Sequence, residues 1–93
     1  MDPIYHIVVS GRVQGVGFRY HTMAAAQRMG ISGWVRNLSN GDVEILARVP
    51  DNRKVPFMAA VRRGPPHARV RNIDVQPGES GVNCPTNGFT IRS

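Results

Sequence analysis

The chain has 93 residues, enough for one small hydrophobic core, so a single domain spanning residues 1–93 is expected. Eleven arginines and one lysine against six acidic residues give a formal charge of +6, which favours partners rich in anionic oxygen, phosphate above all. A single cysteine, Cys84, excludes an internal disulfide and offers no metal cluster. No apolar segment approaches membrane-spanning length and the N-terminus lacks a signal-peptide pattern, so we expect a soluble, unprocessed, monomeric protein of the cytoplasm.

The first predicted elements are a strand, a glycine-rich loop and a helix. Residues 4–10 are β-branched and almost continuously apolar, as in a central strand that is packed on at least one face. From Phe18 onward the apolar residues recur at helical spacing, and Gly30 is placed to end this helix. The stretch between them, GRVQGVGFRY at residues 11–20, has three glycines, two arginines and no acidic residue.

The rest of the chain alternates strand-like, helix-like and loop-like segments. We expect two strands, a helix, a strand and a short final strand at residues 32–38, 42–49, 54–63, 69–76 and 89–92, respectively. The dipeptide Asn40-Gly41 is a strong hairpin signal between the first two of these strands. Pro56 must lie in the first turn of the helix, and residues 77–88 have the composition of a loop.

This order of elements predicts an α+β fold, the ferredoxin-like split βαβ sandwich. In this fold an antiparallel sheet carries two helices on one face, and here a short extra strand follows at the C-terminus. The fold does not select a function, because it carries enzymes, RNA-binding domains and ligand sensors alike. The function must therefore be argued from a site.

The loop from Gly11 to Phe18 has the features of an anion-binding site. Its glycines can adopt positive φ and turn N–H groups toward one point, and the start of the following helix adds unpaired N–H groups. A first helical turn normally favours an acidic residue, yet this one carries Arg19, so we expect an anion to bind there. A tight turn beside a solvated arginine is the alternative. Neither the P-loop nor the dinucleotide-binding pattern matches the loop.

Two motifs resemble the signatures of the acylphosphatase family. GRVQGVGFR at residues 11–19 is similar to the first signature, and GWVRN at residues 33–37 is similar to the second. The resemblance extends over nearly the whole chain and implies the same ferredoxin-like fold. It departs at Val49, where the second signature usually ends in glycine, and at Pro56, near the start of the second helix.

The resemblance implies a metal-independent hydrolase without a cofactor, which converts acyl phosphates to a carboxylate and inorganic phosphate. Arg19 matches the family's phosphate-binding catalytic arginine, and Asn37 matches its water-positioning asparagine. The backbone amides expected to complete the phosphate site are those of Gln14, Gly15, Val16, Gly17 and Phe18. The implied partners are a small-molecule acyl phosphate and inorganic phosphate as product and competing ligand. Nothing in the sequence marks the physiological acyl group.

Two other functions use the same residues differently. A binding module would recognise phosphate without hydrolysing it, as acylphosphatase-like domains do in larger carbamoyl-transferring maturation proteins, but a separate chain of this length favours the enzyme. An RNA-binding domain of this fold would carry an RNP1 pattern of aromatic residues on its central strands, and neither residues 4–10 nor residues 42–49 contain one. We therefore expect no specific nucleic-acid partner and no membrane partner.

Other side chains near the two motifs are given structural roles. His21 lies in the first helical turn and could act as a base, but an exposed helix position is the commoner role of such a histidine. Trp34 is expected to pack, and Arg36 to belong to a solvated basic surface.

Overall fold

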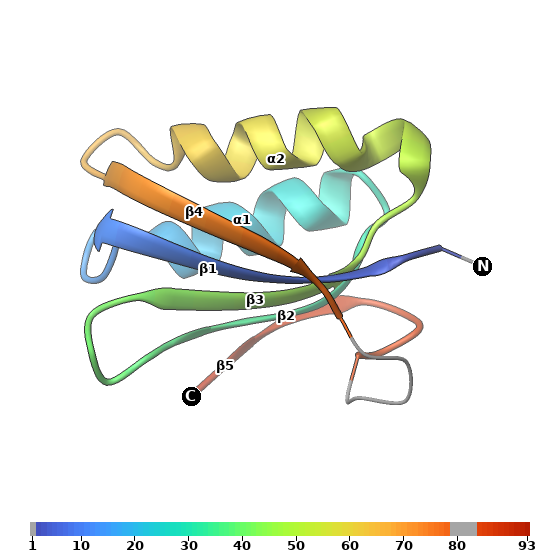
Figure 1. The fold of residues 1–93 in the computed structure, drawn as a ribbon, viewed down its shortest axis with the longest axis horizontal. Helices are drawn as coiled ribbons and strands as arrows, with labels where there is room; N and C mark the ends of the chain where they lie inside the picture. The colour runs from blue at the N-terminus through green and yellow to red at the C-terminus, as the bar shows by residue number, and fades with distance from the viewer. Residues whose placement is uncertain (1, 79–83) are drawn as a thin grey trace.

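A computed structural model describes residues 2–78 and 84–93, which form one five-stranded sheet with two helices (Figure 1). The strands are β1 (Ile4–Arg12), β2 (Ser32–Asn37), β3 (Val43–Arg48), β4 (Arg69–Pro77) and β5 (Phe89–Arg92), and the helices are α1 (Phe18–Arg28) and α2 (Lys54–Arg63). A 3₁₀ turn (Asp51–Arg53) precedes α2. The strands lie side by side in the order β4-β1-β3-β2-β5. The predicted fold class is confirmed, while part of the predicted loop at residues 77–88 lies outside the described residues.

The strand pairing extends what the sequence predicted. β1 pairs antiparallel with both β3 and β4, and β2 pairs antiparallel with β3. The extra strand β5 joins β2 in parallel, so the complete sheet is mixed. β1 runs two residues beyond the predicted end because Gly11 and Arg12 still pair with β4, across a register shift after Ser10. The loop that leads to α1 therefore begins at Val13.

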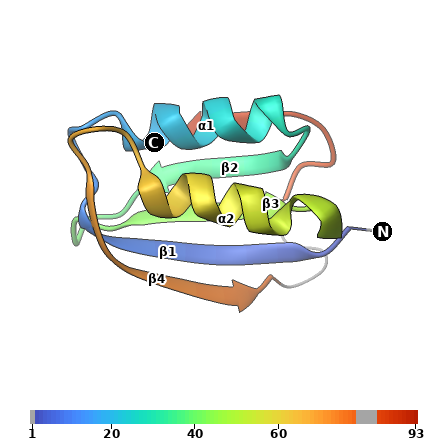
Figure 2. The ribbon, with the colours of Figure 1, turned by 90° about the horizontal axis from the view of Figure 1, so that it is seen from above.

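Both helices cover the same face of the sheet (Figure 2). Their buried side chains are Phe18, Thr22, Ala25 and Ala26 of α1 and Phe57, Ala60 and Val61 of α2. α2 has the predicted bounds although Pro56 is its third residue, because N–H groups in the first turn of a helix have no carbonyl partner within it. Neither helix of the described part is long and apolar enough to cross a membrane.

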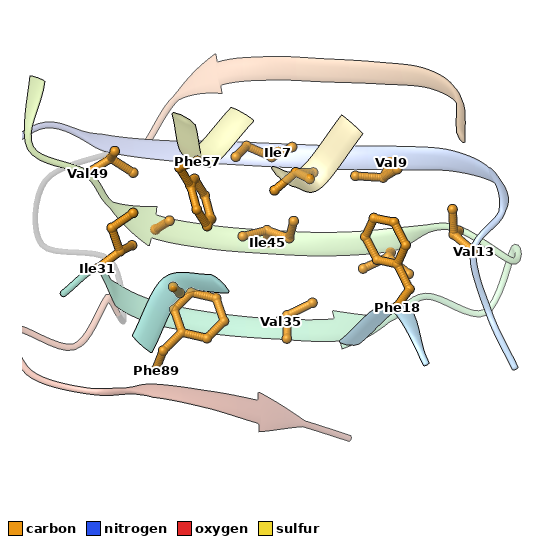
Figure 3. Close-up of a cluster of buried hydrophobic side chains, with 14 residues drawn as sticks. Ile7, Val9, Val13, Phe18, Ile31, Val35, Ile45, Val49, Phe57 and Phe89 are labelled. Carbon is orange, nitrogen blue, oxygen red and sulfur yellow. The ribbon is translucent and has the colours of Figure 1, made fainter. Parts of the chain in front are cut away.

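The core lies between the sheet and the helices. In Figure 3 the side chains of Phe18, Phe57 and Phe89 lie among aliphatic side chains of the sheet. Val49, at the departure from the second signature, is buried in this core, and its N–H donates to the carbonyl of Pro3 at 2.9 Å. The valine is thus accommodated directly after β3. Phe18 is the first residue of α1, so its burial anchors the end of the helix that carries Arg19.

The other face of the sheet carries a small apolar cluster of Trp34, Leu46 and Cys84. Trp34 packs as expected and is only 7% exposed, with the guanidinium groups of Arg36 and Arg92 lying 5.3 and 4.9 Å from the centre of its ring. A tryptophan covered in this way cannot offer its ring to a base, so the RNA-binding alternative gains no support.

Arg36 is partly exposed, as expected of a basic surface, and it also forms an ion pair. Its Nε lies 2.5 Å from Oε1 of Glu44, because the two residues are direct partners in the β2–β3 pairing. His6 on β1 approaches the same carboxylate, with its Nε2 2.6 Å from Oε2 of Glu44. The three side chains form one hydrogen-bonded cluster across three strands.

This cluster predicts a loss of stability in acid. Burial of Glu44 acts to raise its pKa, but hydrogen bonds and charges from His6 and Arg36 outweigh this effect and hold the pKa below the ordinary value of 4.5. A carboxyl group whose pKa is lower in the folded than in the unfolded chain stabilises the fold at pH values above the unfolded pKa. That contribution is lost as the pH falls through the lowered folded pKa.

Replacing Glu44 with glutamine should lower the free energy of unfolding at neutral pH by about 1 to 3 kcal/mol, since charged hydrogen bonds are lost. The variant should also show a shallower decline of stability in acid than the wild type. Urea unfolding across a pH series would measure both effects. Asp74→Asn is the control, because Asp74 is exposed on β4. Parallel pH curves for wild type and Glu44→Gln would contradict the assignment.

Candidate active site

A pocket of about 170 Å³ lies at the start of α1. Its lining residues are Val13, Gly15, Gly17, Phe18, Arg19, Tyr20, Asn37 and Ile91. The structure thus brings Arg19 and Asn37 together, although they belong to different motifs. The β1–α1 loop and the β2–β3 loop lie at the same end of the sheet (Figure 1). Of the predicted loop residues, Gln14 and Val16 are not part of the lining; Val16 is partly buried against the core.

Two glycines give the loop before α1 its path. Gly15 has φ 74° and Gly17 has φ 84°, in the left-handed region that other residues rarely adopt. A Cβ atom at either position would meet nothing within 4 Å, so the backbone angle and not the available space requires glycine. Gly17 is also the N-cap of α1, so its conformation sets the direction in which the helix starts.

The N-terminus of α1 has unused hydrogen-bond donors and an excess of positive charge. No side chain caps it, and its first turn contains no acidic residue. The N–H of His21 donates to the carbonyl of Gly17 at 3.0 Å, so the N–H groups of the three preceding residues have no carbonyl partner within the helix. Arg19 adds a cation that forms no ion pair within residues 2–78 and 84–93. Donors, helix dipole and guanidinium together favour a bound anion.

Asn37 supplies a buried acceptor on the other side of the pocket. It is the last residue of β2 and lies on the same face of the strand as the buried Val35, toward the helices. Its Oδ1 is buried and accepts no hydrogen bond from the described protein. Leaving a buried acceptor without a donor costs about 1–3 kcal/mol, so a water or ligand is expected to donate to it.

The side chain of Gln14 connects the loop before α1 to the loop that follows Asn37. Its Nε2 donates to the carbonyl oxygens of Leu38 and Asp42, both at 2.8 Å. These two carbonyls belong to the loop that follows Asn37, whereas Gln14 belongs to the loop that precedes α1. The sequence predicted Gln14 only as a backbone donor; in the structure its side chain also links the β1–α1 loop to the β2–β3 loop.

Gln14→Ala should lower kcat/KM for an acyl phosphate by roughly 10- to 100-fold, because small displacements of groups that hold substrate and water are costly. Gln14→Glu should be worse, since a carboxylate cannot donate to the two carbonyl oxygens and adds negative charge beside the anion site. Kinetics well below the unfolding midpoint would separate this effect from lost stability. Gln27→Ala, at an exposed position on α1, is the control. Unchanged kcat/KM in Gln14→Ala would contradict the positioning role.

His21 lies outside this pocket. Its Nε2 lies 2.9 Å from the carbonyl oxygen of Ala60 and donates to it, which joins α1 to α2. The side chain lines a separate groove beside Gly64 and Pro65. The hydrogen bond gives His21 a structural role and disfavours it as the base. No three His, Cys, Asp or Glu side chains in the described ranges are grouped to hold a metal ion.

Comparison with known proteins identifies the family. The acylphosphatase family model matches residues 5–91. The acylphosphatase of Nitrobacter hamburgensis is 49% identical over 76 residues, which cover 82% of this chain and 77% of that protein. The crystal structure of acylphosphatase from Bacillus subtilis matches with a TM-score of 0.88 and 41% identity over 97% of this chain and 98% of that chain. HypF from T. kodakarensis matches with a TM-score of 0.82 and 29% identity over 100% of this chain but only 12% of its own. The chain belongs to the acylphosphatase family.

Proposed function

We propose that the chain hydrolyses acyl phosphates by in-line attack of a water, positioned by Asn37, on a phosphoryl group held by Arg19 and loop amides. One observation carries the proposal: Arg19, which has no acidic partner among residues 2–78 and 84–93, and the buried Oδ1 of Asn37, which accepts no hydrogen bond from these residues, line the same pocket at a helix N-terminus. The planar guanidinium of Arg19 can bind two phosphoryl oxygens. Amides from Gln14 to Phe18 and the start of α1 would bind the others and stabilise the charge that develops on them.

The lining of the pocket suits the departure of a carboxylate. As the water oxygen bonds to phosphorus, the bond from phosphorus to the acyl oxygen breaks, and the carboxylate leaves with the electron pair. A carboxylate is a good leaving group and needs little protonation, so a strong general acid is unnecessary. Among the described residues, those that line the pocket include no Asp, Glu, His or Lys.

Asn37 orients the water but does not remove its proton. Its amide oxygen can accept a hydrogen bond from the water, while its nitrogen can donate toward the substrate. We assign the transferred proton to a phosphoryl oxygen of the substrate. The immediate products are then a carboxylate and dihydrogen phosphate, which balances the atoms and charges of the reaction.

The test is an assay of the purified, folded protein on benzoyl phosphate, with and without EDTA and with inorganic phosphate as a competitor. Turnover that persists in EDTA and is competitively inhibited by phosphate would support the proposal. A folded protein that binds phosphate without turnover would instead indicate a phosphate-binding module. Turnover that EDTA abolishes would contradict the metal-independent mechanism.

A further inference from the structure

Two exposed apolar side chains lie at the mouth of the pocket that holds Arg19 and Asn37. In the described part of the chain, the large hydrophobic residues classed as exposed are Tyr20, Val55, Val75 and Ile91. Of these, Tyr20 is 67% exposed and Ile91 is 39% exposed, and both line this pocket. Isolated exposed apolar residues are ordinary, but two from distant parts of the chain that meet at one pocket indicate a contact surface for a ligand.

The parallel pairing of β5 with β2 brings Ile91 to the pocket. Ile91 lies opposite Val35, and Phe89, two residues earlier on the same strand, is buried in the core. Since alternate residues of a strand share a face, Ile91 points to the helix side of the sheet, the face that Val35 and Asn37 share on β2. β5 is in contact with α1, and Tyr20 lies in the first turn of this helix.

In the proposed in-line attack, the acyl group points toward the open side of the pocket. In an in-line displacement the leaving group departs on the side of phosphorus opposite the attacking water. The water is held at the buried Oδ1 of Asn37, so the leaving group points to the open side of the pocket. Tyr20 and Ile91 are the exposed large apolar residues among the described residues that line this pocket, so they are available to contact the acyl group there.

We infer that Tyr20 and Ile91 form the binding site for the acyl group, and that the preferred substrates are acyl phosphates with an aromatic or other bulky apolar acyl group. This inference rests on the proposed function. The charges of the pocket support an uncharged acyl group, because Arg19 is the one charged residue among the described lining residues and binds the phosphoryl group in the proposed mechanism. A second anionic group on the substrate would find no further cation among these residues.

The test compares kcat/KM for benzoyl phosphate and for acetyl phosphate in the wild type and in the double variant Tyr20→Ala/Ile91→Thr. We expect the ratio of the two values, benzoyl over acetyl, to fall roughly tenfold in the double variant, because the apolar contact with the ring is lost. The inhibition constant of inorganic phosphate should stay unchanged, since the phosphate site is intact. Comparing this ratio between the wild type and the variant cancels the difference in intrinsic reactivity between the two substrates, because that difference is the same for both proteins.

The matched control is Val55→Ala/Val75→Thr, which removes exposed apolar surface from α2 and β4, away from the pocket. This control should keep the wild-type ratio. An equal fall for both substrates in Tyr20→Ala/Ile91→Thr, or no fall for either, would overturn the acyl-site inference while leaving the proposed function in place. If the wild type hydrolyses neither substrate, the proposed function fails and the acyl site fails with it.

Discussion

Replacing Arg19 with alanine or lysine should lower kcat/KM for benzoyl phosphate by about 100- to 1000-fold or more, the cost of losing one preorganised charged donor. Alanine removes the cation from the pocket. Lysine keeps a positive charge but loses the planar fork that can bind two phosphoryl oxygens. Steady-state kinetics with benzoyl phosphate would measure both variants.

Arg19→Ala should lower the activity without lowering the stability of the fold. A cation in the first turn of a helix interacts unfavourably with the helix dipole, and Arg19 has no acidic partner in the described residues to offset this. Arg19→Ala should therefore unfold at the same temperature as the wild type or at a higher one. Arg28→Ala, at the opposite end of α1, is the control and should keep its activity. Near-full activity in either Arg19 variant would show that the site is wrongly assigned.

Asn37→Ala should lower kcat by about 100-fold or more while leaving the affinity for inorganic phosphate largely unchanged. In the proposed mechanism, the start of α1 binds the phosphate, whereas Asn37 at the end of β2 binds the attacking water. Removing the amide also removes a buried, unpartnered oxygen, so the fold should lose little stability. Turnover assays combined with phosphate inhibition constants would separate the two effects.

Asn52→Ala is a suitable control for this variant, because Asn52 is exposed in the 3₁₀ turn before α2. It should behave as the wild type in both assays. A fall in phosphate affinity that matches the fall in turnover of Asn37→Ala would mean that Asn37 binds the phosphoryl group rather than the water. The proposed mechanism would then need a different way to position the nucleophile.

The helices could be predicted closely from the sequence because their signals are local. A single apolar stripe and a glycine stop define α1, and α2 begins at Lys54 as predicted because the proline falls within its first turn. The end of β1 was predicted two residues early. Gly11 and Arg12 extend the strand because β4 lies beside them across a bulge, and this long-range pairing cannot be predicted from residues 4–12 alone.

The site could be predicted in part: features that depend on local sequence were predictable, whereas those that depend on contacts between distant segments were not. The glycine-rich loop and a helix start with an arginine and no acid are local features, which is why an anion site could be argued directly. The role of Asn37 came from the resemblance of its motif and stays a proposal. The positions of Gln14 and Ile91 depend on which strands and loops become neighbours, so their side chains could not be assigned in advance.

The central claim is that water attacks phosphorus in the Arg19–Asn37 pocket. Hydrolysis of benzoyl phosphate by the protein in ¹⁸O-enriched water tests it most directly, with the products analysed by mass spectrometry. Attack at phosphorus predicts that one ¹⁸O atom enters inorganic phosphate and that benzoate stays unlabelled. Label in benzoate, which would mean attack at the acyl carbon, would contradict the mechanism.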